Sequence, residues 1–144
     1  MYKRQAIATS AASFSLSEVK IGLVPATIGP YVTAAIGQRA ARRYLLTAER
    51  FDAHTALQLG LVNEVVDEQH LDHEINGLID TLLANGPEAT IAAKKLISDI
   101  SGKPIDQAVI DYTCDLIAGI RVSNQGQEGL NAFLEKRKPQ WIRD

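Results

Sequence analysis

The sequence predicts an α/β protein in which short β-strands at the N-terminal side precede a mostly α-helical C-terminal region. Two observations support this prediction. Residues 6–9 and 13–16 are short runs of β-tolerant residues, separated by small residues. After Pro25, most of the chain consists of segments with the apolar spacing of amphipathic helices, and glycine and proline separate these segments.

The first helical segment begins at Pro30, because proline is tolerated in the first turn of a helix. Residues 30–36 suit a short helix, which Gly37 interrupts. Residues 38–46 then form a second and strongly basic helix. The pattern therefore predicts two helices with a break at a glycine.

A short helix with clear ends follows. Asp52 has the residue type of an N-cap for residues 53–59, since its carboxylate can accept hydrogen bonds from free backbone N–H groups. Gly60 stands where a helix commonly ends in the left-handed conformation. Residues 61–66 (LVNEVV) include three β-branched valines, and they predict another short strand.

Four further helices are expected, and glycine and proline separate the first three in the usual order, with glycine after one helix and proline at the start of the next. Their ranges are 68–84, 87–101, 104–122 and 124–136. We accordingly divide the chain into a β/α part, residues 1–66, and a helical part, residues 67–144.

The segment 104–122 is apolar over a broad sector of the helix surface. Such a helix should be covered on two sides, and packing against a neighbouring subunit is one way to cover it. Cys114 lies in this sector, and we expect it to be a core thiol rather than a reactive one.

Composition indicates a globular domain and excludes several classes of function. The chain has 144 residues and a formal charge of −2, so nucleic acid and anionic membranes are unlikely partners on electrostatic grounds. No apolar run reaches the ~18 residues needed to span a bilayer. A single cysteine excludes an intrachain disulfide, and a reducing, cytoplasmic setting is our default expectation.

Glu18 is the main candidate for chemistry. It shares its strand parity with Phe14 and Leu16, so a continuous strand would direct this carboxylate to an apolar face. A carboxylate there is costly unless it is paired, hydrogen-bonded or functional. The alternative is that the strand ends at Leu16 and that Glu18 is a solvated loop residue.

Two other groups of polar residues are weaker candidates for a functional site. His70 and His73 have a spacing that suits metal binding on a helix, but no further ligands converge on them, so we predict no metal site. Arg39, Arg42 and Arg43 form a basic edge that suits a coenzyme A phosphate or an RNA backbone, but a solvated helix surface is the commoner explanation of such a pattern.

Three ordered segments resemble the crotonase (enoyl-CoA hydratase/isomerase) superfamily. Residues 125–141 (QGQEGLNAFLEKRKPQW) resemble its closing signature, and residues 14–30 resemble its second catalytic-carboxylate region. Residues 46–66 are similar to its "LTGxxxxAxxAxxxGLV" run. The resemblance covers nearly the whole chain but only about the C-terminal half of the family's usual length.

The resemblance implies a role for Glu18 as the second of two catalytic glutamates, the general acid/base beside the α-carbon of the thioester. In the family, the first glutamate lies roughly twenty residues upstream. Here the seventeen residues before Glu18 include no acidic one. The glycine-rich turns that supply oxyanion donors are also absent. We therefore expect a truncated crotonase that has one carboxylate of the pair and little activity alone.

The resemblance also implies a substrate site. Gly22 lets the backbone approach a ligand. Pro25 and Ala26 precede a helix whose N-terminus directs N–H groups toward the acyl group or the water. Lys136 matches the position of basic residues near the 3′-phosphate and adenine of coenzyme A, and Phe133 either lines the acyl end of a neighbouring site or serves as a packing anchor.

By resemblance, the expected activity is an enoyl-CoA hydratase-type lyase reaction on an α,β-unsaturated acyl-CoA, in fatty acid metabolism. The variant around residues 25–30 and 40–51 looks most like methylglutaconyl-CoA hydratases of leucine degradation. No cofactor is implied beyond the coenzyme A of the substrate, and the assembly is a homotrimer or hexamer. The alternatives are an enoyl-CoA Δ-isomerase and a non-catalytic interaction or RNA-binding module.

Overall fold

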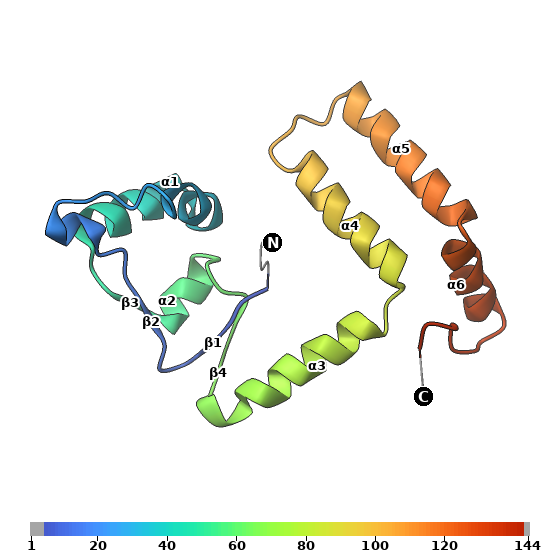
Figure 1. The fold of residues 1–144 in the computed structure, drawn as a ribbon, viewed down its shortest axis with the longest axis horizontal. Helices are drawn as coiled ribbons and strands as arrows, with labels where there is room; N and C mark the ends of the chain where they lie inside the picture. Colours follow the sequence, from blue (N-terminus) through green and yellow to red (C-terminus); the bar gives the residue numbers. More distant parts are fainter. Residues whose placement is uncertain (1–4, 143–144) are drawn as a thin grey trace. The chain divides into compact units, whose positions relative to one another are not determined.

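The computed structural model describes residues 5–142, and the chain forms two compact units, Met1–Gly77 and Leu78–Asp144 (Figure 1). The boundary between the units falls inside helix α3 (Leu71–Leu83). The division into a β/α part, residues 1–66, and a helical part of the trimerisation type, residues 67–144, stays a prediction.

Short strands form the base of the first unit. Strand β1 (Ile7–Thr9) pairs in parallel with β4 (Glu64–Val66). Strand β2 (Ser13–Phe14) pairs antiparallel with β3 (Phe51–Asp52). The predicted strands are thus present but shorter than their apolar runs, and β3 was not predicted, because two residues give no periodic signal.

Two helices of the first unit follow the predicted pattern. Helix α1 (Gly29–Thr47) contains a break at Gly37, whose φ of 75° and ψ of 159° are not helical. Helix α2 (Ala53–Gln58) begins after Asp52, whose Oδ1 accepts a hydrogen bond from the Thr55 N–H at 2.7 Å. Hydrogen bonds from the Thr55 side chain and from its backbone N–H lower the pKa of the Asp52 carboxyl group. Gly60 ends the helix in the left-handed region at φ 75°, as the sequence predicts.

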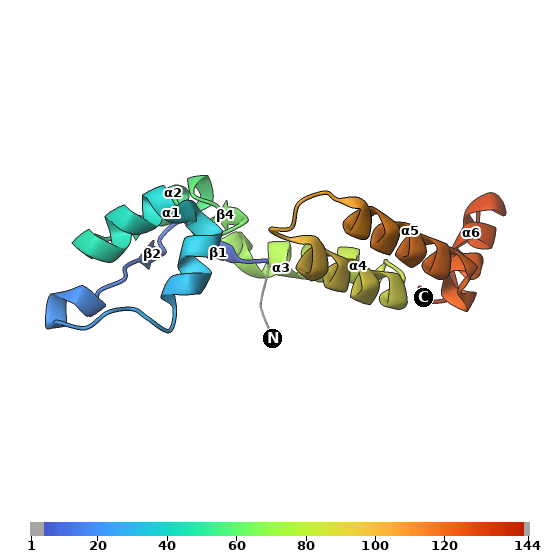
Figure 2. The same ribbon diagram turned by 90° about the horizontal axis from the view of Figure 1, so that it is seen from above.

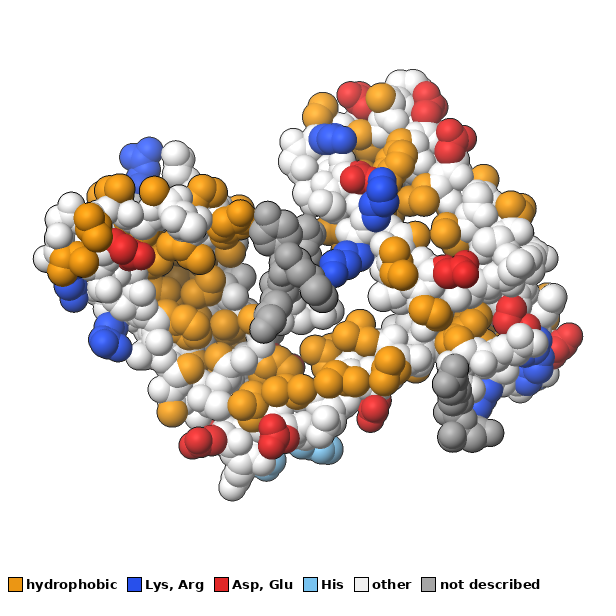
Figure 3. All heavy atoms as spheres, in the orientation of Figure 1, with side chains coloured by type: hydrophobic (Ala, Val, Ile, Leu, Met, Phe, Trp, Pro, Cys, Tyr) orange, Lys and Arg blue, Asp and Glu red, His pale blue; other side chains and the backbone are white. Residues whose placement is uncertain are grey.

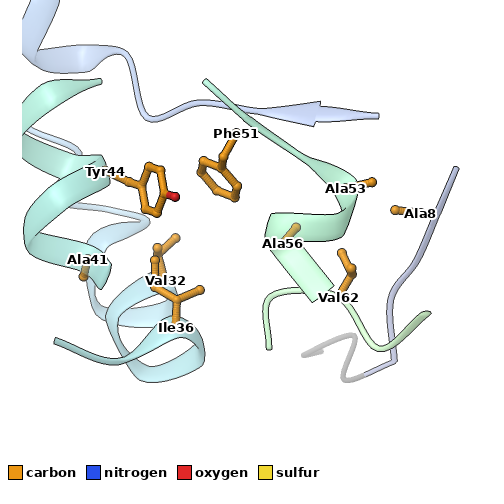
Figure 4. Packing of buried hydrophobic residues seen from close by; sticks show 9 residues of the cluster. All are labelled: Ala8, Val32, Ile36, Ala41, Tyr44, Phe51, Ala53, Ala56 and Val62. Atoms are coloured by element: carbon orange, nitrogen blue, oxygen red, sulfur yellow. The ribbon is translucent and has the colours of Figure 1, made fainter. Parts of the chain in front are cut away.

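A small core holds these elements together (Figure 4). The Phe51 ring lies 4.3 Å from the Tyr44 ring and 5.6 Å from the Phe14 ring, measured between centroids. Ala53 and Ala56 are fully buried, so α2 packs closely because its buried positions are small. The core therefore joins α1, α2 and both strand pairs.

The second unit continues from the end of α3 through α4 (Pro87–Ile100), α5 (Gln107–Val122) and α6 (Asn124–Leu134). Helices α4 and α5 run side by side in both views (Figures 1 and 2). These helices agree with the predicted ranges to within a few residues. A short 3₁₀ turn, η2 (Glu68–His70), occupies the start of the helix predicted over residues 68–84, and α3 follows it.

Polar contacts tie the ends of the second unit together. The Gln125 side-chain oxygen accepts hydrogen bonds from the Glu88 and Ala89 N–H groups at 2.9 and 3.1 Å, and so caps α4. The Trp141 Nε1–H donates to the Ala84 carbonyl oxygen at 3.1 Å. Ala132 is the only apolar residue of this unit that is buried within the described part of the chain.

Many large apolar side chains of the second unit are exposed (Figure 3). On α5, Ile117 is 65% exposed and Val122 is 74% exposed. Cys114 is also exposed, so the prediction of a core thiol is wrong for this chain. The prediction failed because the apolar sector of α5 is wider than the surface that α4 and α6 cover.

The turn between α5 and α6 requires glycine at position 126. A Cβ atom there would lie 2.1 Å from the Ile120 carbonyl oxygen, which is backbone and cannot move aside cheaply. We therefore expect Gly126→Ala to lower the free energy of unfolding by at least about 1–3 kcal/mol, as backbone strain does. Thermal and urea denaturation, followed by circular dichroism, measure this change.

Gly119→Ala is the matched control. Gly119 lies inside α5, and nothing lies within 4 Å of its ideal Cβ. Alanine is favoured over glycine in a helix interior by about 0.8–1 kcal/mol, so this variant should be more stable than the wild type. Equal destabilisation by both substitutions would contradict the steric argument.

Candidate functional site

Glu18 begins a single 3₁₀ turn, η1 (Glu18–Ile21), and does not continue strand β2, which ends at Phe14. The strand therefore ends before Glu18, as in the alternative interpretation, and it ends two residues earlier than Leu16. Glu18 is nevertheless partly buried rather than simply solvated, and exposed residues alternate with partly buried ones from Phe14 through Leu16 to Glu18, so the parity argument holds for burial.

One carboxylate oxygen of Glu18 is buried without a partner. Among the described residues, Glu18 Oε2 is the one buried side-chain oxygen or nitrogen that accepts or donates no hydrogen bond. Buried polar atoms are almost always hydrogen-bonded, so an exception needs a reason. Leaving such a group unsatisfied costs about 1–3 kcal/mol, and more when it is charged.

Gly22 shapes the turn that carries this carboxylate. Its φ of 76° lies in the left-handed region, where glycine is favoured, and its N–H donates to the Val19 carbonyl oxygen at 3.3 Å. The Leu23 N–H donates to the Glu18 carbonyl oxygen at 3.1 Å. No atom lies within 4 Å of an ideal Cβ at Gly22, so the space beside this backbone is open.

Pro25 and Ala26 lie in the loop between η1 and α1. Pro25 is partly buried, and its carbonyl oxygen accepts a hydrogen bond from the Gly29 N–H at 2.7 Å. Ala26 is exposed, and its N–H already donates to the Val24 carbonyl oxygen at 2.8 Å. The Ala26 N–H is therefore occupied in this conformation, so Ala26 offers a ligand its small side chain rather than a free backbone donor.

The surroundings of Glu18 are apolar. Ile21, Leu23 and Val24 are exposed to 75%, 59% and 75% of their surface. On the other side of Glu18 in the sequence, Phe14 and Leu16 help line a hollow of about 460 Å³ in the first unit. The Glu18 segment thus combines a partly buried carboxylate with apolar surface, a combination that suits a largely apolar ligand with one reactive centre.

Phe133 and Lys136 lie together at the end of α6, in the second unit. Phe133 is 81% exposed, so within this chain it is not a packing anchor. Lys136 is exposed and adopts a left-handed conformation, with φ of 55°. The predicted site residues thus form two groups, one in each unit: Glu18, Gly22, Pro25 and Ala26 on one loop, and Phe133 and Lys136 on one helix end.

Arg137, which follows Lys136, is fully engaged by carboxylates. Its Nη1 and Nη2 donate to the two Glu128 oxygens at 2.6 and 2.9 Å, and its Nε donates to Glu135 Oε2 at 2.6 Å. These bonds raise the pKa of Arg137 and lower the pKa of the Glu128 carboxyl group. Sequence reasoning missed this bidentate pair, because residues nine apart across a helix end show no local spacing rule.

The histidines do not form a metal centre. In the part of the chain that the structure describes, no group of three or more His, Cys, Asp or Glu side chains is placed to hold a metal ion. His70 and Glu74 line a hollow of about 290 Å³ with His54 and Asp67, but they do not converge on one point. No helix among residues 5–142 is long and apolar enough to cross a membrane.

Comparisons with known proteins extend over nearly the whole chain. A family model described as enoyl-CoA hydratase/isomerase matches residues 5–144. The crystal structure of an enoyl-CoA hydratase from Shewanella pealeana superposes with a TM-score of 0.89 at 56% identity, covering 95% of this chain and 51% of that one.

Two sequence relatives are more distant. A crotonyl-CoA hydratase of Syntrophomonas wolfei is 31% identical over 137 residues, which are 94% of this chain and 52% of the relative. A mitochondrial enoyl-CoA hydratase domain-containing protein 3 of Xenopus laevis is 30% identical over 136 residues, 94% of this chain and 46% of the relative. The chain thus spans about half the length of the relatives it matches.

The fold is the predicted one, crotonase-like α/β with few short strands and mostly helical content. The family model covers nearly all residues, and the folds agree over the same range at high identity. This chain belongs to the enoyl-CoA hydratase/isomerase family.

Proposed function

We propose that this chain forms part of an enoyl-CoA hydratase that adds water across the double bond of an α,β-unsaturated acyl-CoA thioester. The observation that supports the proposal is the unpaired, buried oxygen of Glu18, which lies where the family resemblance puts a catalytic carboxylate. A buried carboxylate without a partner is free to exchange a proton with a ligand.

Glu18 is the general acid/base of this proposal. In hydration, the hydroxyl group of water bonds to the β-carbon and a proton bonds to the α-carbon. Glu18 transfers the proton at the α-carbon, next to the thioester carbonyl. Donors that stabilise the enolate-like oxygen, and the first glutamate of the pair, come from the half of the relatives' fold that this chain does not span.

The remaining site residues bind the substrate. Gly22 leaves open space beside the backbone of the turn that carries Glu18, and Pro25 and Ala26 shape the loop before α1. Phe133 contributes exposed apolar surface for an acyl group of a neighbouring site. The ammonium group of Lys136 binds the 3′-phosphate of coenzyme A. The protein binds the substrate through the substrate's own coenzyme A, and the proposed reaction uses no metal or redox cofactor.

The acyl group is a separate part of the proposal. The residues around the Glu18 loop favour a methylglutaconyl-CoA-type substrate and hence leucine degradation, whereas one relative bears the name crotonyl-CoA hydratase. The alternative activity is a double-bond isomerisation, which a missing first glutamate would favour. The cytoplasmic setting also remains a prediction, and one relative's name includes the word mitochondrial.

The exposed apolar surface of the second unit supports a homotrimer or hexamer. Ile91, Ile117 and Val122 are each at least 65% exposed in this chain. Burial of apolar surface contributes roughly 25 cal/mol per Å², so a second copy that covers these side chains is stabilised. A purely interaction or RNA-binding role is the competing class, and strong salt-sensitive RNA binding without coenzyme A affinity would favour it.

Glu18→Gln should abolish most of the activity in a protein that joins this chain to the missing half of the fold. We expect the hydration turnover to fall at least about a hundredfold, the usual scale for the loss of a general acid/base. The thermal midpoint should stay the same or rise, because the variant removes a buried charge. Steady-state assays on crotonyl-CoA and methylglutaconyl-CoA, with calorimetry, test both statements.

Glu64→Gln serves as the control, since Glu64 is an exposed carboxylate on β4 of the same unit. It should leave turnover within about twofold of the wild type, as surface substitutions away from a site normally do. Wild-type turnover in Glu18→Gln would remove Glu18 from the mechanism.

The 144-residue chain by itself should show no hydratase turnover on either substrate. Loss of one oxyanion donor alone costs about 10²–10³ in rate, and this sequence supplies neither the donor turns nor a second carboxylate before Glu18. The measurement compares the purified chain with the version completed by the other half of the fold. Comparable rates would show that residues 1–144 contain a complete site.

Assembly is tested by sedimentation velocity and light scattering of the purified chain. We expect trimers, hexamers or aggregates at tens of micromolar, on the order of working concentrations for weak interfaces. Replacing the exposed apolar residue Ile117 with Glu should shift the distribution toward monomer. A clean monomer of the wild-type chain at that concentration would count against trimer-like packing.

A further inference from the structure

Helix α6 ends in a hydrogen-bonding pattern that usually requires glycine. The Lys136 N–H donates to the Phe133 carbonyl oxygen at 3.2 Å, and the Arg137 N–H donates to the Ala132 carbonyl oxygen at 3.0 Å. These two bonds define a Schellman motif, whose residue after the helix adopts the left-handed conformation. That residue is Lys136, and its φ of 55° is costly for a residue with a side chain.

Only two residues other than glycine have a positive φ among those the structure describes, Ala48 and Lys136. Ala48 is completely buried, so its methyl group packs in the core. Lys136 is exposed, and its side chain gains no such packing. A strained and exposed residue points to function, because the surrounding structure must hold it in place.

The ion pair between Arg137 and Glu128 stabilises the backbone next to Lys136. Glu128 lies on α6, and its side chain is 17% exposed, the least of any carboxylate in a salt bridge of the described residues. It accepts both parallel hydrogen bonds from the Arg137 guanidinium group and a third from the Gln140 N–H at 3.0 Å. Bidentate pairs of this kind fix geometry as well as charge.

Arg137 of this pair directly follows Lys136 in the sequence, and helix α6 precedes Lys136. Arg137 also donates to Glu135 and to the Lys138 carbonyl oxygen, so its guanidinium group contacts residues on both sides of Lys136. Together with the two backbone bonds of the Schellman motif, these contacts restrict the backbone that carries the Lys136 side chain. Arg137 forms salt bridges with two carboxylates, Glu128 and Glu135. Among the described residues, none of the salt bridges includes Lys136.

We propose that the Glu128–Arg137 pair is a positioning device that presents the Lys136 ammonium group to the 3′-phosphate of coenzyme A. The inference rests on the proposed function, because it needs Lys136 to bind this phosphate. It assigns Arg137 a role different from that of its basic neighbour: Arg137 positions the phosphate-binding residue and does not bind the phosphate.

The test measures the preference of the chain for coenzyme A over 3′-dephospho-coenzyme A, by calorimetric titration of both ligands. Lys136→Gly should lose this preference, by about threefold to tenfold, the scale of one partly exposed charge-assisted contact. The same variant should have a higher thermal midpoint than the wild type, because glycine relieves the positive φ. Glu128→Gln keeps Lys136 but should lose most of the preference.

Asp99→Asn is the matched control. Asp99 also pairs with a cation in the second unit, Lys95, at 2.6 Å, and accepts a hydrogen bond from the Tyr112 hydroxyl at 2.6 Å. Breaking this ion pair should change stability but leave the ligand preference unchanged. Hydrogen exchange of the Lys136 and Arg137 amides should accelerate in Glu128→Gln and not in Asp99→Asn.

The double variant Glu128→Gln with Lys136→Gly decides whether the two residues act as a unit. If the pair acts through Lys136, the double variant should lose no more preference than Lys136→Gly alone. An unchanged preference in Glu128→Gln, with faster amide exchange, would overturn the inference and leave the proposed function intact. A wild-type chain that binds both ligands equally, or binds neither, would overturn the role of Lys136 and the inference together.

Discussion

The contacts of the Phe51 ring, stacked on Phe14 and tilted against Tyr44, are the ones on which the first unit depends. They join β2, β3 and α1, and β2 and α1 flank the segment 15–28 that carries Glu18. Phe14, before this segment, and Val32, after it, both pack in the core cluster that contains Phe51, so the loop between them can expose apolar residues and still hold its turn. Truncating Phe51 would therefore release the strand pair and the Glu18 loop together.

The second unit is stabilised differently. Its described part buries almost no large apolar side chain, and polar tethers at the helix ends fix its turns: Gln125 on α4, Trp141 on the Ala84 carbonyl, and Glu128 on Arg137. Such tethers fix geometry but contribute modestly to stability, since exposed pairs are screened by solvent. The unit therefore has well-defined ends and a largely exposed apolar surface.

The sequence predicted those features whose cause is local. The Asp52 cap, the left-handed Gly60 and the break at Gly37 each depend on a few adjacent residues, and all three are confirmed. Strand β3, the exposure of Cys114 and the Glu128–Arg137 pair depend on residues distant in sequence or on how much surface a neighbour covers. For Glu18, parity with Phe14 and Leu16 agrees with its partial burial, whereas its role in the site stays a prediction. The strand ends earlier, because Ser17 and the glycine at position 22 favour a turn there.

The Glu18 segment has two energetically unfavourable features, and the binding of one ligand or chain segment can relieve both. Glu18 Oε2 is buried without a partner, and Ile21, Leu23 and Val24 beside it expose most of their surface to water. A structural role for the carboxylate would require a donor, and none is present among the described residues. A ligand or chain segment that brings both apolar surface and a proton donor would satisfy the oxygen while it covers the loop. An acyl thioester with its attacking water has this composition, so under the proposed function the substrate would cover the apolar loop and give the buried oxygen a hydrogen-bond partner.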